Sequence, residues 1–97
     1  MLFAIMCTDK PASLPIRLAT RDKHIAYLLG RAASLVQAGP LLDPEGRPCG
    51  SLLLVEAEDA DAAHALTAGD PYALAGLFES VVVRPFRTVF RDGVLVG

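Results

Sequence analysis

The chain has 97 residues, a formal net charge of −2 and a hydrophobic fraction of 53%, against only 21% charged residues. This composition excludes a disordered chain, and the absence of a basic stripe argues against nucleic acid as a partner. The apolar runs, such as residues 52–55, are far shorter than the roughly 20 residues of a membrane span, so we expect one small domain with no membrane partner.

The first predicted element is a strand over residues 2–8, in which both alternating sets of side chains are apolar. This pattern is typical of a strand buried on both faces. A short turn or helix follows over residues 13–18, and a longer helix is predicted over residues 22–36, where apolar residues recur at helical spacing. This apolar stripe consists of Ile25, Leu28, Leu29, Ala32 and Val36.

A hairpin is predicted next, because two prolines and a glycine in residues 43–48 separate two apolar runs. Its strands are expected at residues 38–42 and 50–57. A short helix follows, with acidic residues at 58–61 near its start, where the helix dipole favours them.

Asp70-Pro71 begins a further helical turn, since aspartate is a good N-cap and proline suits the first helical position. The last strand is predicted over residues 80–90. Pro85 within it indicates an edge strand or a bulge, and residues 91–97 are expected to form a loose tail.

The resulting order, βαββαβ, predicts a single α+β domain over residues 1–97 with a ferredoxin-like fold. Right-handed crossovers place both helices on one face of a four-stranded antiparallel sheet. The first and third strands are nevertheless apolar on both sides, so the other face also needs a cover. With no third layer in the chain, we expect a second copy of the sheet, and therefore a homodimer through this face.

His24 and Asp70 are the candidates for chemistry. His24 falls one turn into the predicted long helix, at the edge of its apolar stripe, where nearness to the helix N-terminus favours the neutral imidazole. Asp70 can cap a helix and still orient an imidazole with its second oxygen. Each residue also has a purely structural interpretation, the histidine as a packed border residue and the aspartate as an N-cap.

The remaining reactive side chains give weaker signals. Cys7 is expected in the core and Cys49 in the hairpin loop as free thiols, because neither belongs to a CxxC motif or a Cys/His cluster. No metal site is therefore predicted. His64 is expected at the surface. The N-terminal segment lacks the features of a signal peptide, so a cytoplasmic protein is expected.

Several short stretches, taken together in order and spacing, resemble the YCII-related domain family over about residues 1–90. They are Asp9-Lys10-Pro11, Arg17, Arg21-x-x-His24-x-x-Tyr27-Leu28, Ala38-Gly39-Pro40, Asp70-Pro71-Tyr72 with Ala75-Gly76-Leu77, and Val83-Arg84-Pro85-Phe86. The resemblance implies a dimeric α/β-barrel arrangement of the ferredoxin-like fold. It also implies a pocket in each subunit that contains His24 and Asp70. One branch of the family removes chloride from a chlorinated hydroxyquinol, but the proline-rich loop and Cys49 depart from common members.

The hypothesis that follows is a cofactor-independent enzyme of lyase, dehydrochlorinase or isomerase type. His24, held by Asp70, would transfer protons on a small polar or aromatic molecule. Asp9, Arg17 and Tyr72 are expected to line the same pocket, with Arg17 binding an anion. The alternative is a module that binds a small ligand without turnover, or a purely structural dimer.

Overall fold

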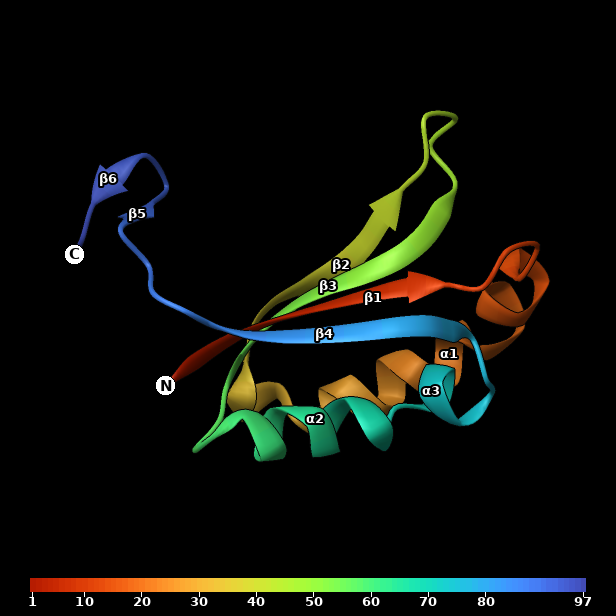
Figure 1. The fold of residues 1–97 in the computed structure, drawn as a ribbon, viewed down its shortest axis with the longest axis horizontal. Coiled ribbons are helices and arrows are strands. Elements are labelled where there is room, and N and C mark those ends of the chain that lie inside the picture. Colours follow the sequence, from red (N-terminus) through yellow and green to blue (C-terminus); the bar gives the residue numbers. More distant parts are fainter.

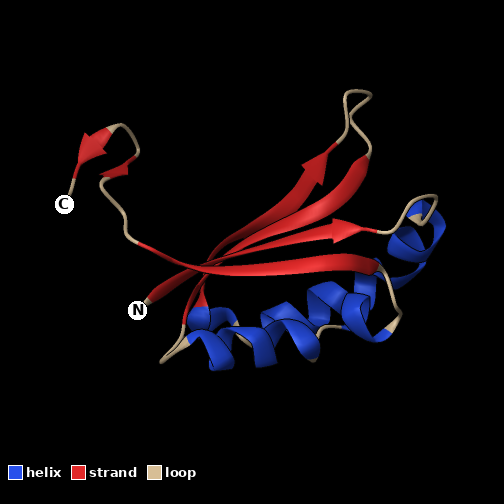
Figure 2. Ribbon diagram, in the orientation of Figure 1, coloured by secondary structure: helices blue, strands red, loops and turns tan.

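The computed structural model describes every residue from Met1 to Gly97. It consists of a four-stranded sheet with all helices on one face, and of a small C-terminal hairpin that projects beyond the sheet (Figure 1 and Figure 2). In chain order, the elements are β1 (Leu2–Asp9), α1 (Leu14–Leu29), a 3-10 turn η1 (Ala32–Ser34), β2 (Leu35–Leu42), β3 (Pro48–Glu56), α2 (Ala60–Ala68), α3 (Pro71–Leu74), β4 (Phe78–Phe86), β5 (Phe90–Arg91) and β6 (Val94–Leu95).

The sheet has the strand order β2-β3-β1-β4, and every neighbouring pair is antiparallel. The two central strands are β1 and β3, the strands whose sequences are apolar on both sides. At the centre of the sheet, Ile5 pairs with Leu53 on one side and with Val83 on the other. Pro85 lies in the edge strand β4, as predicted. The predicted ferredoxin-like α+β fold is thus confirmed.

The hydrophobic core fills the space between the sheet and the helices. Phe3, Ile5 and Cys7 point from β1 toward the helices and are at most 2% exposed. Alternation along a strand explains this, since residues two apart share a face. The core is completed by Leu28, Leu53, Val55 and Ala63.

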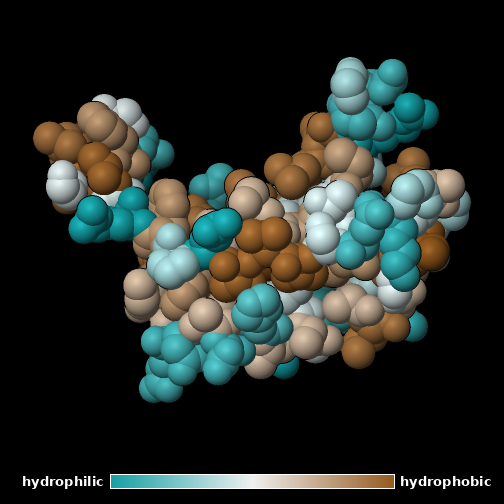
Figure 3. All heavy atoms as spheres, viewed as in Figure 1, coloured by the Kyte–Doolittle hydropathy of each residue, from teal (hydrophilic) through white to brown (hydrophobic).

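The face of the sheet away from the helices carries apolar side chains that nothing in the chain covers. Met6 lies between Leu52 and Val82 in the register of the sheet, and these three side chains are 43%, 40% and 40% exposed. Leu41 and Phe86 extend the apolar surface towards the two edge strands. Hydrophobic side chains are also seen over β4 and on the C-terminal hairpin, with a concave surface between this hairpin and the β2–β3 turn (Figure 3).

The first helix begins and ends earlier than predicted. Residues 13–18 contain the N-cap and the first turn of α1 and do not form a separate turn. Periodicity does not indicate this start, because the buried inner face of the helix includes the charged residue Arg17. A charged residue at a buried position interrupts the apolar stripe that periodicity detects. Residues after Gly30 leave the helix, and Val36 belongs to β2. No helix, including the 16-residue α1, is both long and apolar enough to cross a membrane.

This change of boundaries also corrects the expected setting of His24. The residue lies in the second half of α1, far from the N-terminus of the helix. The favourable effect of a helix terminus is confined to about one turn, so the helix dipole does not select the neutral imidazole here.

The C-terminal segment differs from the predicted long strand and loose tail. β4 ends at Phe86, and residues 90–97 contain the β5–β6 hairpin, in which Phe90 pairs with Leu95. Its two-residue loop is Asp92-Gly93, and both residues have positive φ, 51° and 75°. An Asp-Gly pair of this conformation is a strong hairpin signal, but the flanking strands have only two residues each, which is too short for alternation to indicate them.

The core thiol supplies a pH-dependent test of this fold. Burial raises the pKa of Cys7 from 9.0 to about 12. The unfolded chain therefore loses this proton at lower pH than the folded protein does. Consequently, the free energy of unfolding should fall as pH rises from about 9 to about 12, with no contribution from Cys7 below that range.

Urea unfolding at a series of pH values checks this prediction, with the slope above pH 9 as the readout. Cys7→Ala should show a smaller decline than the wild type over that range, although its cavity lowers stability at every pH. Cys49→Ala, which removes an exposed thiol, is the matched control and should keep the wild-type slope. Equal slopes for Cys7→Ala and wild type would contradict the prediction.

Candidate functional site

His24 and Asp70 lie in contact, although they are 46 residues apart in the chain. The Nδ1 atom of His24 is 2.9 Å from Oδ1 and 2.8 Å from Oδ2 of Asp70. The Asp70 side chain is 3% exposed, and that of His24 is 14% exposed. No other hydrogen bond to the ring is present, so Nε2 has no partner within the protein.

Asp70 is held in place by its local sequence. It is the N-cap of α3, and its Oδ1 accepts a hydrogen bond of 2.9 Å from the backbone N–H of Tyr72. Pro71 follows at the start of the helix, where its fixed φ is favourable. The same carboxylate therefore caps one helix and bonds to a histidine of another, which joins α3 to α1.

Tyr72 brings an aromatic ring against this pair. Its ring stacks on that of His24, with centroids 3.9 Å apart and planes at 16°. The guanidinium carbon of Arg17 lies 4.6 Å from the centre of the Tyr72 ring. Burial raises the pKa of Tyr72, and the nearby positive charge of Arg17 offsets this only in part. The phenol is therefore a neutral hydrogen-bond donor at physiological pH.

Arg17 forms a buried ion pair with Asp9 at the end of β1. Its Nε and Nη2 atoms donate to the two carboxylate oxygens at 2.7 and 2.9 Å, and Nη2 also donates to Ser51 at 2.9 Å. Burial alone would lower the pKa of Arg17, but the hydrogen bonds and charge of Asp9 raise it further above its ordinary value. The guanidinium is therefore charged, and most of its donors are engaged inside the protein.

A cleft of about 290 Å³ lies between α1 and the β2–β3 part of the sheet. It brings together three of the five residues predicted for the site: His24, Arg17 and Tyr72. Asp70 and Asp9 are not part of its lining, and each is paired with a residue that is. The rest of the lining consists of Leu18, Arg21, Ile25, Leu28, Ala38, Gly39, Pro40, Pro48, Ser51 and Leu53.

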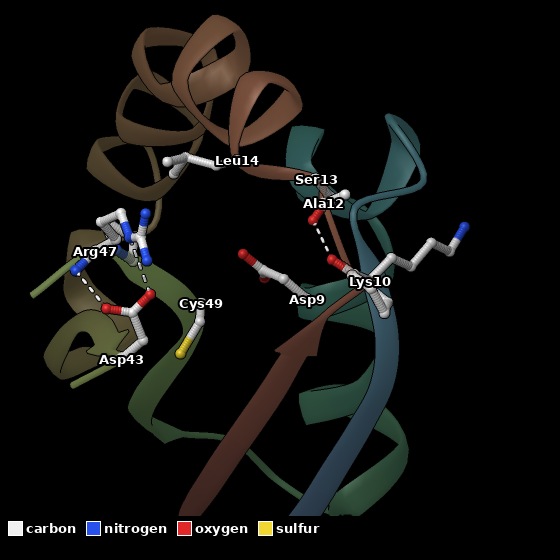
Figure 4. A pocket seen from close by; sticks show the side chains of 10 residues that line it. Asp9, Lys10, Ala12, Ser13, Leu14, Asp43, Arg47 and Cys49 are labelled. Carbon is white, nitrogen blue, oxygen red and sulfur yellow. Dashed lines mark hydrogen bonds and ion pairs between the residues drawn. The ribbon is translucent and has the colours of Figure 1, made fainter. Parts of the chain in front are cut away.

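A second hollow, of about 390 Å³, lies beside the turn that joins β2 to β3 (Figure 4). The Asp9 carboxylate projects into it from the end of β1, and Cys49 faces it from β3. Its Arg47 is already engaged by Asp43 and Glu45. Although larger, this hollow has no histidine and no pair of groups suited to proton transfer, so the cleft beside His24 is the better candidate site.

The sequence did not identify Ser51 and Arg21 as lining residues. Ser51 is an inward-facing polar residue of a central strand, and alternation along β3 could have indicated it. Arg21 belongs to the same stretch as His24 and lies one helical turn before it. His64 is exposed as expected, and Cys7 lies in the core. No group of three or more His, Cys, Asp or Glu side chains is arranged to hold a metal ion.

The sheet order and the helices on one face define a small α+β protein with the ferredoxin-like fold, and its structural neighbours are dimeric α/β-barrel proteins. An antibiotic biosynthesis monooxygenase shares this fold, with a TM-score of 0.52 and 15% identity over 91% of this chain and all of the other. The chain belongs to the YCII-related domain family, whose model matches residues 1–87.

Two relatives are similar over nearly the whole chain. Protein YciI of Escherichia coli is 40% identical over 93% of this chain and 100% of its own length. The 5-chloro-2-hydroxyhydroquinone dehydrochlorinase of Burkholderia phenoliruptrix, solved in complex with 2,5-dihydroxybenzoquinone, is 35% identical. Its structure covers 90% of this chain and 94% of its own, with a TM-score of 0.82. This chain is thus a YciI-like protein that is structurally close to a dehydrochlorinase.

The buried ion pair leads to a prediction about stability. Arg17→Met leaves the Asp9 carboxylate buried without its partner, and we expect a loss of about 3–5 kcal/mol in the free energy of unfolding at neutral pH. Urea unfolding measures this loss. Arg47→Met removes an arginine whose side chain is 62% exposed and serves as the control, with a far smaller expected change. If both substitutions lowered the free energy of unfolding equally, the Arg17–Asp9 pair would stabilise the fold no more than an exposed ion pair does.

Proposed function

We propose that this protein is a cofactor-independent enzyme that uses His24 and Asp70 for general acid–base chemistry on a small polar or aromatic molecule. The observation that carries the proposal is the hydrogen-bonded contact of His24 Nδ1 with a buried carboxylate, in a residue that lines a cleft. An ionised carboxylate only accepts hydrogen bonds, so Nδ1 carries the proton and Nε2 is the basic nitrogen.

In the proposed reaction, Nε2 takes a proton from a hydroxyl or an acidic carbon of the bound molecule. Asp70 stabilises the resulting imidazolium. Return of the proton to another atom of the molecule gives an isomerisation, and departure of a group such as chloride gives an elimination. Proton transfer of this kind contributes about 10²–10⁴ in rate.

The comparison with the dehydrochlorinase supports a ligand of the hydroxylated ring type, since that relative was solved with 2,5-dihydroxybenzoquinone. The cleft volume of about 290 Å³ is close to the lower end of the roughly 300–1,000 Å³ of small-molecule sites. Both observations favour a molecule with a single ring. Arg17 and Ser51 line the cleft beside it, with Arg17 held in place by Asp9, while the neutral phenol of Tyr72 is available as a donor.

His24→Gln and Asp70→Asn test the proposed chemistry on a panel of hydroxylated and halogenated aromatic compounds. His24→Gln should lower turnover by about 10²–10⁴, because the base is lost. Asp70→Asn should also lower turnover. Because asparagine caps a helix as well as aspartate does, this variant should remain folded. Asp59→Asn, which alters the N-cap of α2 outside the cleft, should have no effect on turnover.

A module that binds a ligand without turnover is the second candidate, and the capping role of Asp70 favours it. In that case the His24–Asp70 contact only joins α1 to α3. Ligand binding would then be saturable, and the wild type would convert none of the compounds. A folded His24→Gln variant that retains full turnover would contradict the acid–base proposal.

We further infer that two copies associate through the open face of the sheet. The apolar side chains there are about 40% exposed, and no other part of the chain covers them. Residues 38–40 of β2 line the cleft, and they also line a shallow hollow on the open face. One strand would therefore separate the interface from the site.

This inference predicts that Leu52→Glu, at the centre of the open face, converts a dimer to a monomer. Leu29→Glu introduces the same charge at an exposed leucine of α1 and should leave the dimer intact. Sedimentation velocity measures the oligomeric state of both variants. If the interface supports β2, the monomer should also bind ligand more weakly than the dimer does. A wild type that is monomeric at all concentrations would contradict the inference.

A further inference from the structure

The charges around the cleft are not balanced. Its lining contains Arg17, Arg21 and His24 but no carboxylate. Two of these residues have a buried partner behind the lining, since Arg17 pairs with Asp9 and His24 contacts Asp70. The side chain of Arg21 forms no hydrogen bond or ion pair with any residue of the chain. The cleft therefore has one positive charge that the protein itself does not compensate.

Arg21 lies on the same face of α1 as His24, the proposed base. It follows Arg17 by four residues and precedes His24 by three on α1, so the three side chains share one face of the helix. Its positive charge acts on the phenol of Tyr72, the ring that stacks on His24. Residues at this spacing have Cβ atoms about 5–6 Å apart, which is close to the width of one aromatic ring.

Arg17, which the sequence indicated as the anion-binding residue, is less suited to that task. Two of its three guanidinium nitrogens donate to Asp9, and one of these also donates to Ser51. Its charge is neutralised by a carboxylate at 2.7 Å. A ligand anion would gain little from this guanidinium, whereas at Arg21 it would meet an uncompensated charge with free donors.

We propose that Arg21 selects the substrate by binding an anionic oxygen, so that the molecule converted here is a ring with an ionised hydroxyl or a carboxylate. The planar guanidinium can bind such a group through two parallel hydrogen bonds. The opposite part of the ring then lies beside Nε2 of His24. This assignment rests on the proposed function, since it places the anion relative to the proposed base.

Titration with two quinones tests the assignment. The first probe is 2,5-dihydroxybenzoquinone, whose acidic hydroxyl groups make it anionic at neutral pH. The second is 2,5-dimethoxybenzoquinone, which has the same ring but no charge. Calorimetric titration of the wild type should give tighter binding of the dihydroxy compound, and added salt should weaken that binding.

Arg21→Gln and Lys23→Gln test whether binding depends on a positive charge at position 21 in particular. Both substitutions remove one positive charge from an exposed residue of α1, but Lys23 does not line the cleft. Arg21→Gln should weaken binding of the dihydroxy compound about tenfold or more, the size of a hydrogen bond to a charged group. Lys23→Gln should change it by less than about twofold, because screened charges at a distance contribute little. Arg21→Lys should recover only part of the affinity.

Each outcome bears on one of the two proposals. Arg21→Gln with wild-type affinity for the dihydroxy compound, or equal losses in Arg21→Gln and Lys23→Gln, would overturn the role of Arg21. A wild type that binds the dimethoxy compound as tightly would also overturn it. If Arg21→Gln loses affinity as expected while His24→Gln keeps full turnover, the anion site stands and the proposed acid–base function fails.

Discussion

The buried carboxylate of Asp70 is the constraint on which the candidate site depends. Burying a charge is costly unless hydrogen bonds satisfy it, and here the backbone N–H of Tyr72 and the ring of His24 supply them. The first bond fixes the start of α3, and the second joins that short helix to α1. The ring of Tyr72, whose backbone N–H donates to Asp70, then stacks on the histidine. Helix capping, helix packing and orientation of the imidazole therefore depend on the same carboxylate.

A second buried pair, Asp9 with Arg17, supports the opposite end of the same helix face. It ties the end of β1 to α1, and Ser51 extends the contact to β3. With both ends fixed, the face of α1 that carries Arg17, Arg21 and His24 is held opposite the sheet, across the cleft. The thin core of a domain of 97 residues offers little other means of fixing a cleft. This arrangement explains why so many polar side chains lie inside so small a protein.

Much of the fold could be predicted from the sequence, because strand patterning depends on local alternation. The apolar alternation of residues 2–8 correctly predicted a strand, and with it a second sheet face that no other part of the chain covers. The N-cap role of Asp70 followed from the Asp-Pro pair. The start of α1 could not be predicted from periodicity, because the helix buries Arg17. A charged residue can be assigned to a buried position only once its partner, here Asp9, is known. The Asp92-Gly93 turn was present in the sequence but lay between strands too short to recognise.

The contact between His24 and Asp70 is a different case, since 46 residues separate them. No pattern within the chain indicates it, and only the resemblance to a family suggested that the two share a pocket. The lack of a partner for Arg21 is likewise a property of the folded chain, visible only when every neighbouring carboxylate has been located.

In the proposed mechanism, Asp70 fixes the tautomer of His24 and leaves Nε2 as the basic nitrogen. A long-range proton–nitrogen NMR correlation spectrum of the His24 ring, recorded at a pH where the ring is neutral, tests it most directly. We expect a proton on Nδ1 and an unprotonated Nε2 in the wild type. A neutral ring with its proton on Nε2 would contradict it.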